Sequence, residues 1–168
     1  NVTVTATSNG QTVTDVFEVT VSETDDGPYV AVPLPDLTVD EDAADSTIAL
    51  GNVFNDIDDD NASIVKTVVS GGVSLVAASV SGNTLTLDFQ GNQSGSTAIY
   101  VTGTSNGQTV EDVFTVTVGA VDDAPVTANP IEDLTVNEDA PDLVMALGNV
   151  FNDVDDDNAS IVKTATSD

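Results

Sequence analysis

Short segments of alternating apolar and polar residues run along the chain, and turn-forming residues separate them. One clear case is the segment 84–89, in which Leu85, Leu87 and Phe89 alternate with polar residues. A period of two residues is typical of a β-strand with one buried face. No segment keeps the 3.6-residue period of an amphipathic helix. The pattern therefore predicts an all-β protein.

The strand signals follow one another at the roughly 8–12-residue spacing that is typical of all-β folds. Eight strands are predicted in the middle of the chain: Tyr29–Val32, Leu37–Asp40, Thr47–Leu50, Ser63–Val69, Val73–Ala77, Thr84–Phe89, Thr97–Thr104 and Thr109–Val118. Between the last two, Asn106-Gly107 favours a type I′ hairpin, because both residues tolerate a positive φ. Asn9-Gly10 repeats this signal near the N-terminus.

The chain also contains a long internal repeat. The segment VFNDIDDDNASIVKT at 53–67 recurs as VFNDVDDDNASIVKT at 150–164, and TATSNGQTVTDVFEVTV at 5–21 recurs as TGTSNGQTVEDVFTVTV at 102–118. DDGP at 25–28 recurs as DDAP at 122–125. All three pairs are offset by 97 residues. This period is too long for a solenoid unit and suits a β-sandwich domain.

The repeat divides the chain into three parts. Residues 1–24 are the last strands of one repeat, 25–121 are a complete repeat, and 122–168 are the first part of the next. Neither end-piece contains a complete domain, so we expect the sequence to be a window from a longer tandem array. The N-terminus shows no leader segment, and no apolar run is long enough to predict insertion into a membrane.

Charge excludes several function classes. The chain has 29 acidic residues against 2 lysines, a net charge of −27, and neither His nor Cys. Binding of nucleic acid or of an anionic membrane surface is excluded, because both need basic residues. Catalysis and zinc sites based on His or Cys are excluded by composition. A large excess of carboxylates fits either a hard cation or a solvated surface.

The positions of the acids favour a cation over a solvated surface. Of the 14 acids between Asp25 and Val118, 11 lie between Asp25 and Asp60. A solubilising surface predicts scattered acids, whereas Ca²⁺ needs about six to eight oxygen ligands gathered by loops. Mg²⁺ fits less well, because it retains several waters and uses few carboxylates. A solvated acidic loop is the alternative interpretation.

Candidate Ca²⁺ ligands lie in the linkers and loops of two consecutive repeats. In the complete repeat they are Asp25, Asp26, Glu41, Asp42, Asp56, Asp58 and Asp60, and in the next Asp122, Asp123, Glu138, Asp139, Asp153, Asp155 and Asp157. The start of the segment 56–67 matches an EF-hand loop, but Asn61 replaces the required Gly and Thr67 replaces the bidentate Glu. The remaining ligands must therefore come from elsewhere in the fold. Because the linker acids stand between repeats, we expect Ca²⁺ to turn a flexible array into a rod.

The order DDAPV…DLTVNEDAP…LGNVFNDVDDDNAS…VTGTSNGQTVEDVFTVTV resembles the cadherin-like, dystroglycan-type repeats of giant bacterial surface proteins. The resemblance covers the complete repeat and both end-pieces. It implies tandem Greek-key, Ig- or cadherin-like β-sandwiches, an extracellular location, and Ca²⁺ held by Asp25 or Asp26, Glu41, Asp42, Asp56, Asp58 and their repeat equivalents. Many such repeats carry an Asp just before the hairpin. Here the sequence reads Thr7-Ser8 and Thr104-Ser105, which predicts a weaker site or fewer ions.

Three functions remain open from the sequence. The first is a structural repeat of an adhesin or surface filament, whose partners are the neighbouring repeats. The second is binding of surface polysaccharide, for which Tyr29 and Tyr100 are the only exposed-aromatic candidates, and the third is homotypic adhesion or fibre formation with other copies of the chain. The acids repeat at junctions instead of converging on one pocket, so we expect no enzyme. Lys66 and Lys163 fit either an ordinary lysine or an isopeptide cross-link.

Overall fold

The computed structural model describes residues 1–167. It contains β1 (Val2–Ser8), β2 (Gln11–Phe17), β3 (Tyr29–Val30), β4 (Leu37–Asp40), β5 (Ser46–Ala49), β6 (Phe54–Asn55), β7 (Val65–Ser70), β8 (Val76–Ser81), β9 (Thr84–Phe89), β10 (Gly95–Ser105), β11 (Gln108–Gly119), β12 (Val126–Thr127) and β13 (Phe151–Asn152). Within the described residues there is no helix with the length and apolar character needed to cross a membrane.

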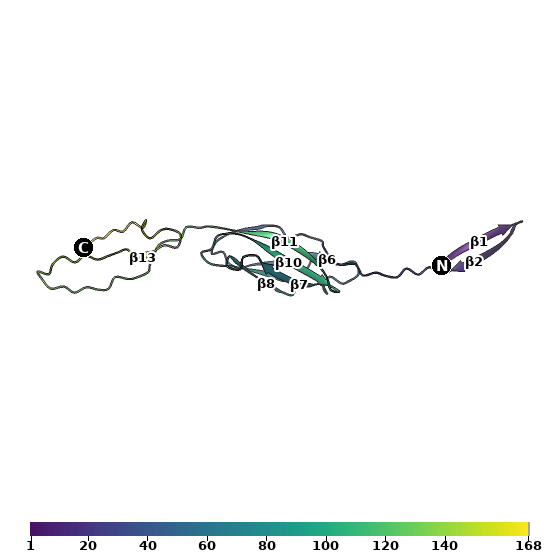
Figure 1. Cartoon of the computed structure of the whole chain (residues 1–168), viewed down its shortest axis with the longest axis horizontal. Coiled ribbons are helices and arrows are strands. Elements are labelled where there is room, and N and C mark those ends of the chain that lie inside the picture. The colour runs from purple at the N-terminus through teal and green to yellow at the C-terminus, as the bar shows by residue number, and fades with distance from the viewer. Residues whose placement is uncertain (168) are drawn as a thin grey trace.

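Strands β3–β11 form a β-sandwich in the middle of the molecule (Figure 1). One sheet has the order β4-β11-β10-β7 and the other β5-β9-β8, with the short ladder β3-β6 beside them. β4 pairs with β11 in parallel, while the other ladders are antiparallel. These orders match the C-F-G and B-E-D sheets of the Ig fold. The prediction of an all-β, Greek-key, Ig-like sandwich is therefore confirmed.

The core lies between the two sheets and follows the predicted alternation. Leu85 and Leu87 of β9, Val101 of β10, and Phe114 and Val116 of β11 are each 2% exposed or less. The residues that alternate with them in β9 and β11 are exposed or half-buried. Burial of such apolar side chains is the main favourable term in folding.

Most of the predicted strands occur, but one is misplaced. β4 and β9 have the predicted bounds, whereas Val73–Ala77 is not a strand over its first half. There, the amides of Leu75 and Val76 both donate to the carbonyl oxygen of Gly72, which forms a turn before β8. The chain turns at this point because Gly71 approaches β10, and its amide donates to the Ala98 carbonyl at 2.9 Å. The short strand β6 was also missed.

The two end-pieces extend from opposite ends of the sandwich (Figure 1). At the N-terminus, β1 and β2 form a separate hairpin that pairs with no other strand of residues 1–167. At the C-terminus, β12 and β13 form a two-stranded ladder and residues 153–167 contain no strand. The acid-rich segments lie where these pieces meet the sandwich.

Candidate cation site at the repeat junction

The acidic loop 56–63 follows β6 and is closed by its own hydrogen bonds. Asp56 Oδ1 accepts from the amides of Asp58 and Asp59 at 3.0 and 3.2 Å. The Asp56 amide donates to Asn61 Oδ1 at 3.3 Å. The loop at 153–160 repeats these bonds with Asp153 in place of Asp56, at 3.1, 3.2 and 3.0 Å. The loop conformation is therefore encoded locally in both copies.

The second oxygen of Asp56 has no partner. The residue is 5% exposed, and Oδ2 accepts no hydrogen bond from the part of the chain that the structure describes. A buried polar atom without a partner costs about 1–3 kcal/mol, and more when it is charged. A carboxylate oxygen is also the type of ligand that hard cations bind.

At the second junction, the linker backbone is held from both sides. The Val121 amide donates to Glu41 Oε1 at 2.6 Å, and buried Glu41 donates its own amide to Gly119 at 2.8 Å. Two residues later, the Asp123 amide donates to Asp155 Oδ2 at 2.6 Å. Val121 is thus tied to the complete repeat and Asp123 to the next. Only Asp122 lies between the two attachments.

Carboxylates from three segments lie near enough to Asp123 to affect its pKa. The pKa of the Asp123 carboxyl is raised, first by partial burial and then by the negative charges of Asp42, Asp155, Glu41 and Asp153. These acids belong to the loop after β4, to the linker and to the acidic loop of the next repeat. A cavity of about 310 Å³ at this place is lined by residues that include Asp42, Asn92 and Asp123. The arrangement gathers negative charge from two repeats at one point.

The first junction shows the same contact on one side. The Asp26 amide donates to Asp58 Oδ2 at 2.7 Å, which is the counterpart of the bond between Asp123 and Asp155. Residues 1–24 contain no counterparts of Glu41 and Asp42. Of the three segments that meet at the second junction, the first junction therefore contains two.

Other predicted ligands bond to their own surroundings. Asp60 and Asp157 accept from the amides of Ala62 and Ala159, inside their loops. Asp42 Oδ1 accepts from the Asn92 amide at 3.0 Å. The remaining positions are Asp25, which bonds to the hairpin tip of β10–β11, and exposed Glu138, Asp139 and Asp122. Across residues 1–167, no three acidic side chains are close enough to hold one ion in this geometry.

Sequence reasoning missed Asp59 as a contributor to this region. Its Oδ2 accepts from Ser105 Oγ at 2.6 Å and from Asn106 Nδ2 at 2.8 Å. Asn106 was explained by the turn alone, although its side-chain amide can also donate. Ser105, which lies just before the hairpin turn, therefore donates a hydrogen bond to an acid of the loop.

Lys66 is buried inside the acidic loop. Its Nζ donates to the carbonyl oxygens of Ile64 at 3.0 Å and Asn61 at 3.3 Å, and desolvation lowers its pKa. Lys163 makes the same two bonds in its copy, at 3.0 and 3.2 Å. In both copies the lysine ammonium group donates hydrogen bonds to backbone carbonyls of the loop. These hydrogen bonds account for the position of the lysine without a covalent cross-link.

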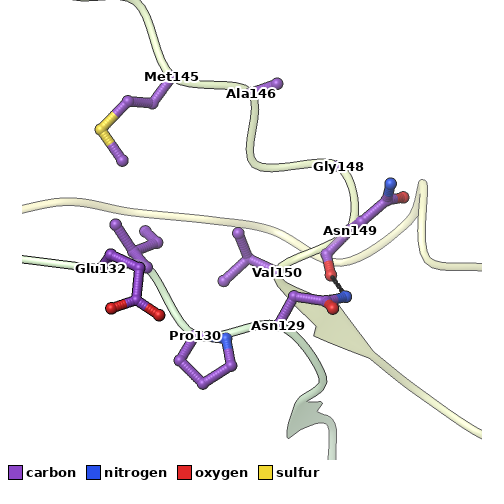
Figure 2. Close-up of a pocket in the computed structure, with 9 residues that line it drawn as sticks. Asn129, Pro130, Glu132, Met145, Ala146, Gly148, Asn149 and Val150 are labelled. Atoms are coloured by element: carbon purple, nitrogen blue, oxygen red, sulfur yellow. Dashed lines mark hydrogen bonds between the residues drawn. The ribbon is translucent and has the colours of Figure 1, made fainter.

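A larger cavity, of about 460 Å³, lies in the C-terminal piece between the segments 129–132 and 145–150 (Figure 2). At one side of it, Asn129 Nδ2 donates to the Asn149 carbonyl at 2.6 Å. Ile131 and Val150 line this cavity, and in the complete repeat their counterparts Leu34 and Val53 pack in the core. The cavity therefore corresponds to core volume and not to a ligand site.

No protein-family model matches the chain, and no curated protein matches it. Among solved structures, a chimeric titin Z1Z2 is 15% identical with a TM-score of 0.41, covering 59% of this chain and 100% of that chain. Titin domain M7 is 14% identical with a TM-score of 0.41, over the same shares. An endo-fucoidan hydrolase of glycoside hydrolase family 107 is 19% identical with a TM-score of 0.42, covering 77% of this chain.

This chain spans 21% of that hydrolase, and 14% of a variant form of it that is 17% identical with a TM-score of 0.42. At these identities and TM-scores, the likeness carries no information about function.

Proposed function

We propose that the chain is a structural module of an extracellular tandem array, such as a large adhesin or a surface filament. In this proposal, Ca²⁺ binds at the junctions and fixes the angle between neighbouring sandwiches. The observation that carries the proposal is the second junction, where Glu41 and Asp155 hold the linker from opposite sides. A site built from both repeats couples cation binding to their relative orientation.

The chemistry of the junction suits Ca²⁺. Glu41, Asp123 and Asp155 supply carboxylate oxygens from three segments, and the linker backbone adds carbonyls. Like charges at close range repel one another, so a divalent cation between them relieves the repulsion and draws the segments together. Within residues 1–167, no three of these carboxylates are close enough to share one ion in this geometry. Binding therefore requires a small movement of the linker and the two loops toward the ion.

The exposed aromatics favour a structural role over polysaccharide binding. Tyr29 and Tyr100 are 43% and 37% exposed and belong to different sheets. The hydroxyl group of Tyr29 accepts a hydrogen bond from Asn55 Nδ2 at 2.6 Å. Two separated rings do not form a continuous stacking platform for a sugar chain. Polysaccharide binding and homotypic adhesion stay untested predictions.

The proposal is tested by Ca²⁺ titration of the chain, followed by the melting temperature. A ligand at 100 times its Kd stabilises the state that binds it by about 2.7 kcal/mol, so the melting temperature should rise on saturation. Glu41→Gln should weaken the response at the second junction. Asp88→Asn is the matched control, because Asp88 is exposed and lies in β9. A melting temperature that does not change on saturation with Ca²⁺ contradicts the proposal.

The substitution Asp56→Asn tests whether Asp56 is a Ca²⁺ ligand or only a structural acid of the loop. The substitution keeps Oδ1 as the acceptor for the loop amides and replaces Oδ2, which accepts no hydrogen bond, by a neutral amide group. In chelator, the variant should therefore melt at the same temperature as the parent chain or higher. In Ca²⁺, it should respond less than the parent chain. A parent chain and variant that respond equally to Ca²⁺ would remove Asp56 from the ligand set.

A further inference from the structure

The tip of the β10–β11 hairpin forms hydrogen bonds with the linker that precedes the sandwich. Asn106 Nδ2 donates to Asp25 Oδ1 at 2.8 Å and to Asp59 Oδ2 at 2.8 Å. Its single amide group therefore bridges a linker carboxylate and a carboxylate of the acidic loop. Hydrogen bonds to ionised acceptors are stronger than those between neutral groups. The bridge joins three segments that are far apart in the sequence.

Two further donors complete the contact. Buried Ser105 donates from Oγ to Asp59 Oδ2 at 2.6 Å, and Gln108 Nε2 donates to Asp25 Oδ2 at 3.0 Å. Both oxygens of Asp25 are thus satisfied by neutral side chains. We call Ser105, Asn106 and Gln108, with the two acids that they hold, the clasp.

The linker sequence leaves room for the clasp. A Cβ at Gly27 would lie 2.8 Å from Gln108 Oε1, so the absence of a side chain lets Gln108 cross the linker. Asn106 and Gly107 have φ values of 46° and 82°, as the type I′ turn requires. The turn thereby directs the Asn106 amide toward the linker acid.

The clasp holds a linker position that the backbone contacts leave free. Asp25 is the repeat counterpart of Asp122, which lies between the attachments of Val121 and Asp123. The next residue, Asp26, is already held through its amide by Asp58. The hydrogen bonds to the Asp25 side chain therefore extend the fixed part of the linker by one residue, toward the preceding repeat.

We propose that Ser105, Asn106 and Gln108 are positioning residues that restrain Asp25 without any cation. The clasp is distinct from the proposed Ca²⁺ site. Its donors are neutral side chains, and they belong to the same repeat, 25–121, as the two acids that they hold. It confines the cation-free hinge of the first junction to residues before Asp25. Ca²⁺ then acts on a linker that is already attached to the following sandwich.

The experiment is ¹⁵N relaxation of the whole chain in chelator, with variants of the two hairpin tips. Asn106→Gly removes the amide and keeps a residue that tolerates positive φ. Asn106→Asp keeps the turn and replaces the donor by an acceptor. Asn9→Gly is the matched control, because Asn9 has a φ of 55° in the equivalent turn, whose tip points away from the sandwich (Figure 1).

In the parent chain, we expect the heteronuclear NOE at Asp25 and Asp26 to match that of the sandwich strands. Asn106→Gly and Asn106→Asp should both lower it there, while β9 stays unchanged and Asn9→Gly has no effect. Gln108→Ala, which lies outside the turn, should give a smaller loss. The proposal is overturned if Asp25 in the parent chain is as mobile as Ser22, or if neither Asn106 variant changes it.

These readouts separate the two proposals. The clasp is measured in chelator, where the cation site makes no contribution. A chain with an ordered Asp25 in chelator and no response to Ca²⁺ keeps the clasp and loses the cation site. The reverse result, a mobile Asp25 that Ca²⁺ orders, removes the clasp and keeps the cation site.

Discussion

Two segments of nearly the same sequence, 53–67 and 150–164, adopt one loop but two different continuations. They differ only at Ile57 and Val154. Both close the acidic loop with the same hydrogen bonds, but only the first continues into a strand, β7. β7 pairs with β10, and no strand among the described residues takes the place of β10 beside the second copy. The loop is thus encoded locally, whereas the strand needs a tertiary partner.

The two hairpins show the same distinction. β1–β2 and β10–β11 form around Asn-Gly turns in equivalent register, with Thr5 opposite Thr14 and Thr102 opposite Glu111. Phe114 is 2% exposed, whereas its counterpart Phe17 is 47% exposed. The turn and cross-strand pairs suffice for the hairpin, and the second sheet decides whether its apolar face is buried.

The largest expected effect comes from supplying the missing partners. Appending a second copy of residues 72–121 after Asp168 adds counterparts of β8–β11 to the C-terminal piece. Residues 162–167 should then form a strand and bury Lys163, as Lys66 is buried now. The calorimetric unfolding enthalpy should increase on the order of 70 kcal/mol, at about 0.7 kcal/mol per residue. Unchanged enthalpy, with unprotected amides at 162–167, would mean that the copies differ for another reason.

Truncating the equivalent phenylalanines should give a smaller but clear difference. Phe114→Ala opens a cavity in the core and should cost about 3–5 kcal/mol of unfolding free energy in denaturant titration. Phe17→Ala changes a residue that is about half exposed and should leave the sandwich transition in place. Equal losses from the two substitutions would contradict the view that the hairpins differ in burial.

A smaller effect is expected where the hairpins differ in one methyl group. A Cβ at Gly103 would lie 2.8 Å from Cγ of the buried Phe54 ring, whereas the counterpart in β1 is Ala6. Gly103→Ala should cost about 1–3 kcal/mol through overpacking, measured by denaturant unfolding. Ala6→Gly should change the same transition by less than about 1 kcal/mol. A neutral Gly103→Ala would show that Phe54 can move aside without loss.

Much of the fold could be predicted because its signals are local. The alternation in β9 and the turn at Asn106-Gly107 depend on neighbouring residues, and both occur as predicted. β8 was misplaced because Val73 is apolar but lies in a turn that starts at Gly72, which only the contact with β10 explains. Apolar character alone does not distinguish a strand from a turn that packs on a sheet.

The candidate site was predictable in composition but not in connectivity. The clustering of acids identified Glu41, Asp123 and Asp155, which the structure brings to one junction. It also grouped Asp25 with them, although the carboxylate of Asp25 bonds to Asn106 and Gln108. Sequence spacing shows which acids share a loop, whereas the direction of each side chain depends on the strands and turns around it.

The most direct test of the junction account is an NMR titration of Ca²⁺ into the whole chain. The amides of Val121 and Asp123 report on the two sides of the linker, because one donates to Glu41 and the other to Asp155. Both signals should shift together, saturate with one apparent Kd, and lose that response in Glu41→Gln. Signals that stay unchanged, or that shift linearly without saturation, would contradict a cation site shared by the two repeats.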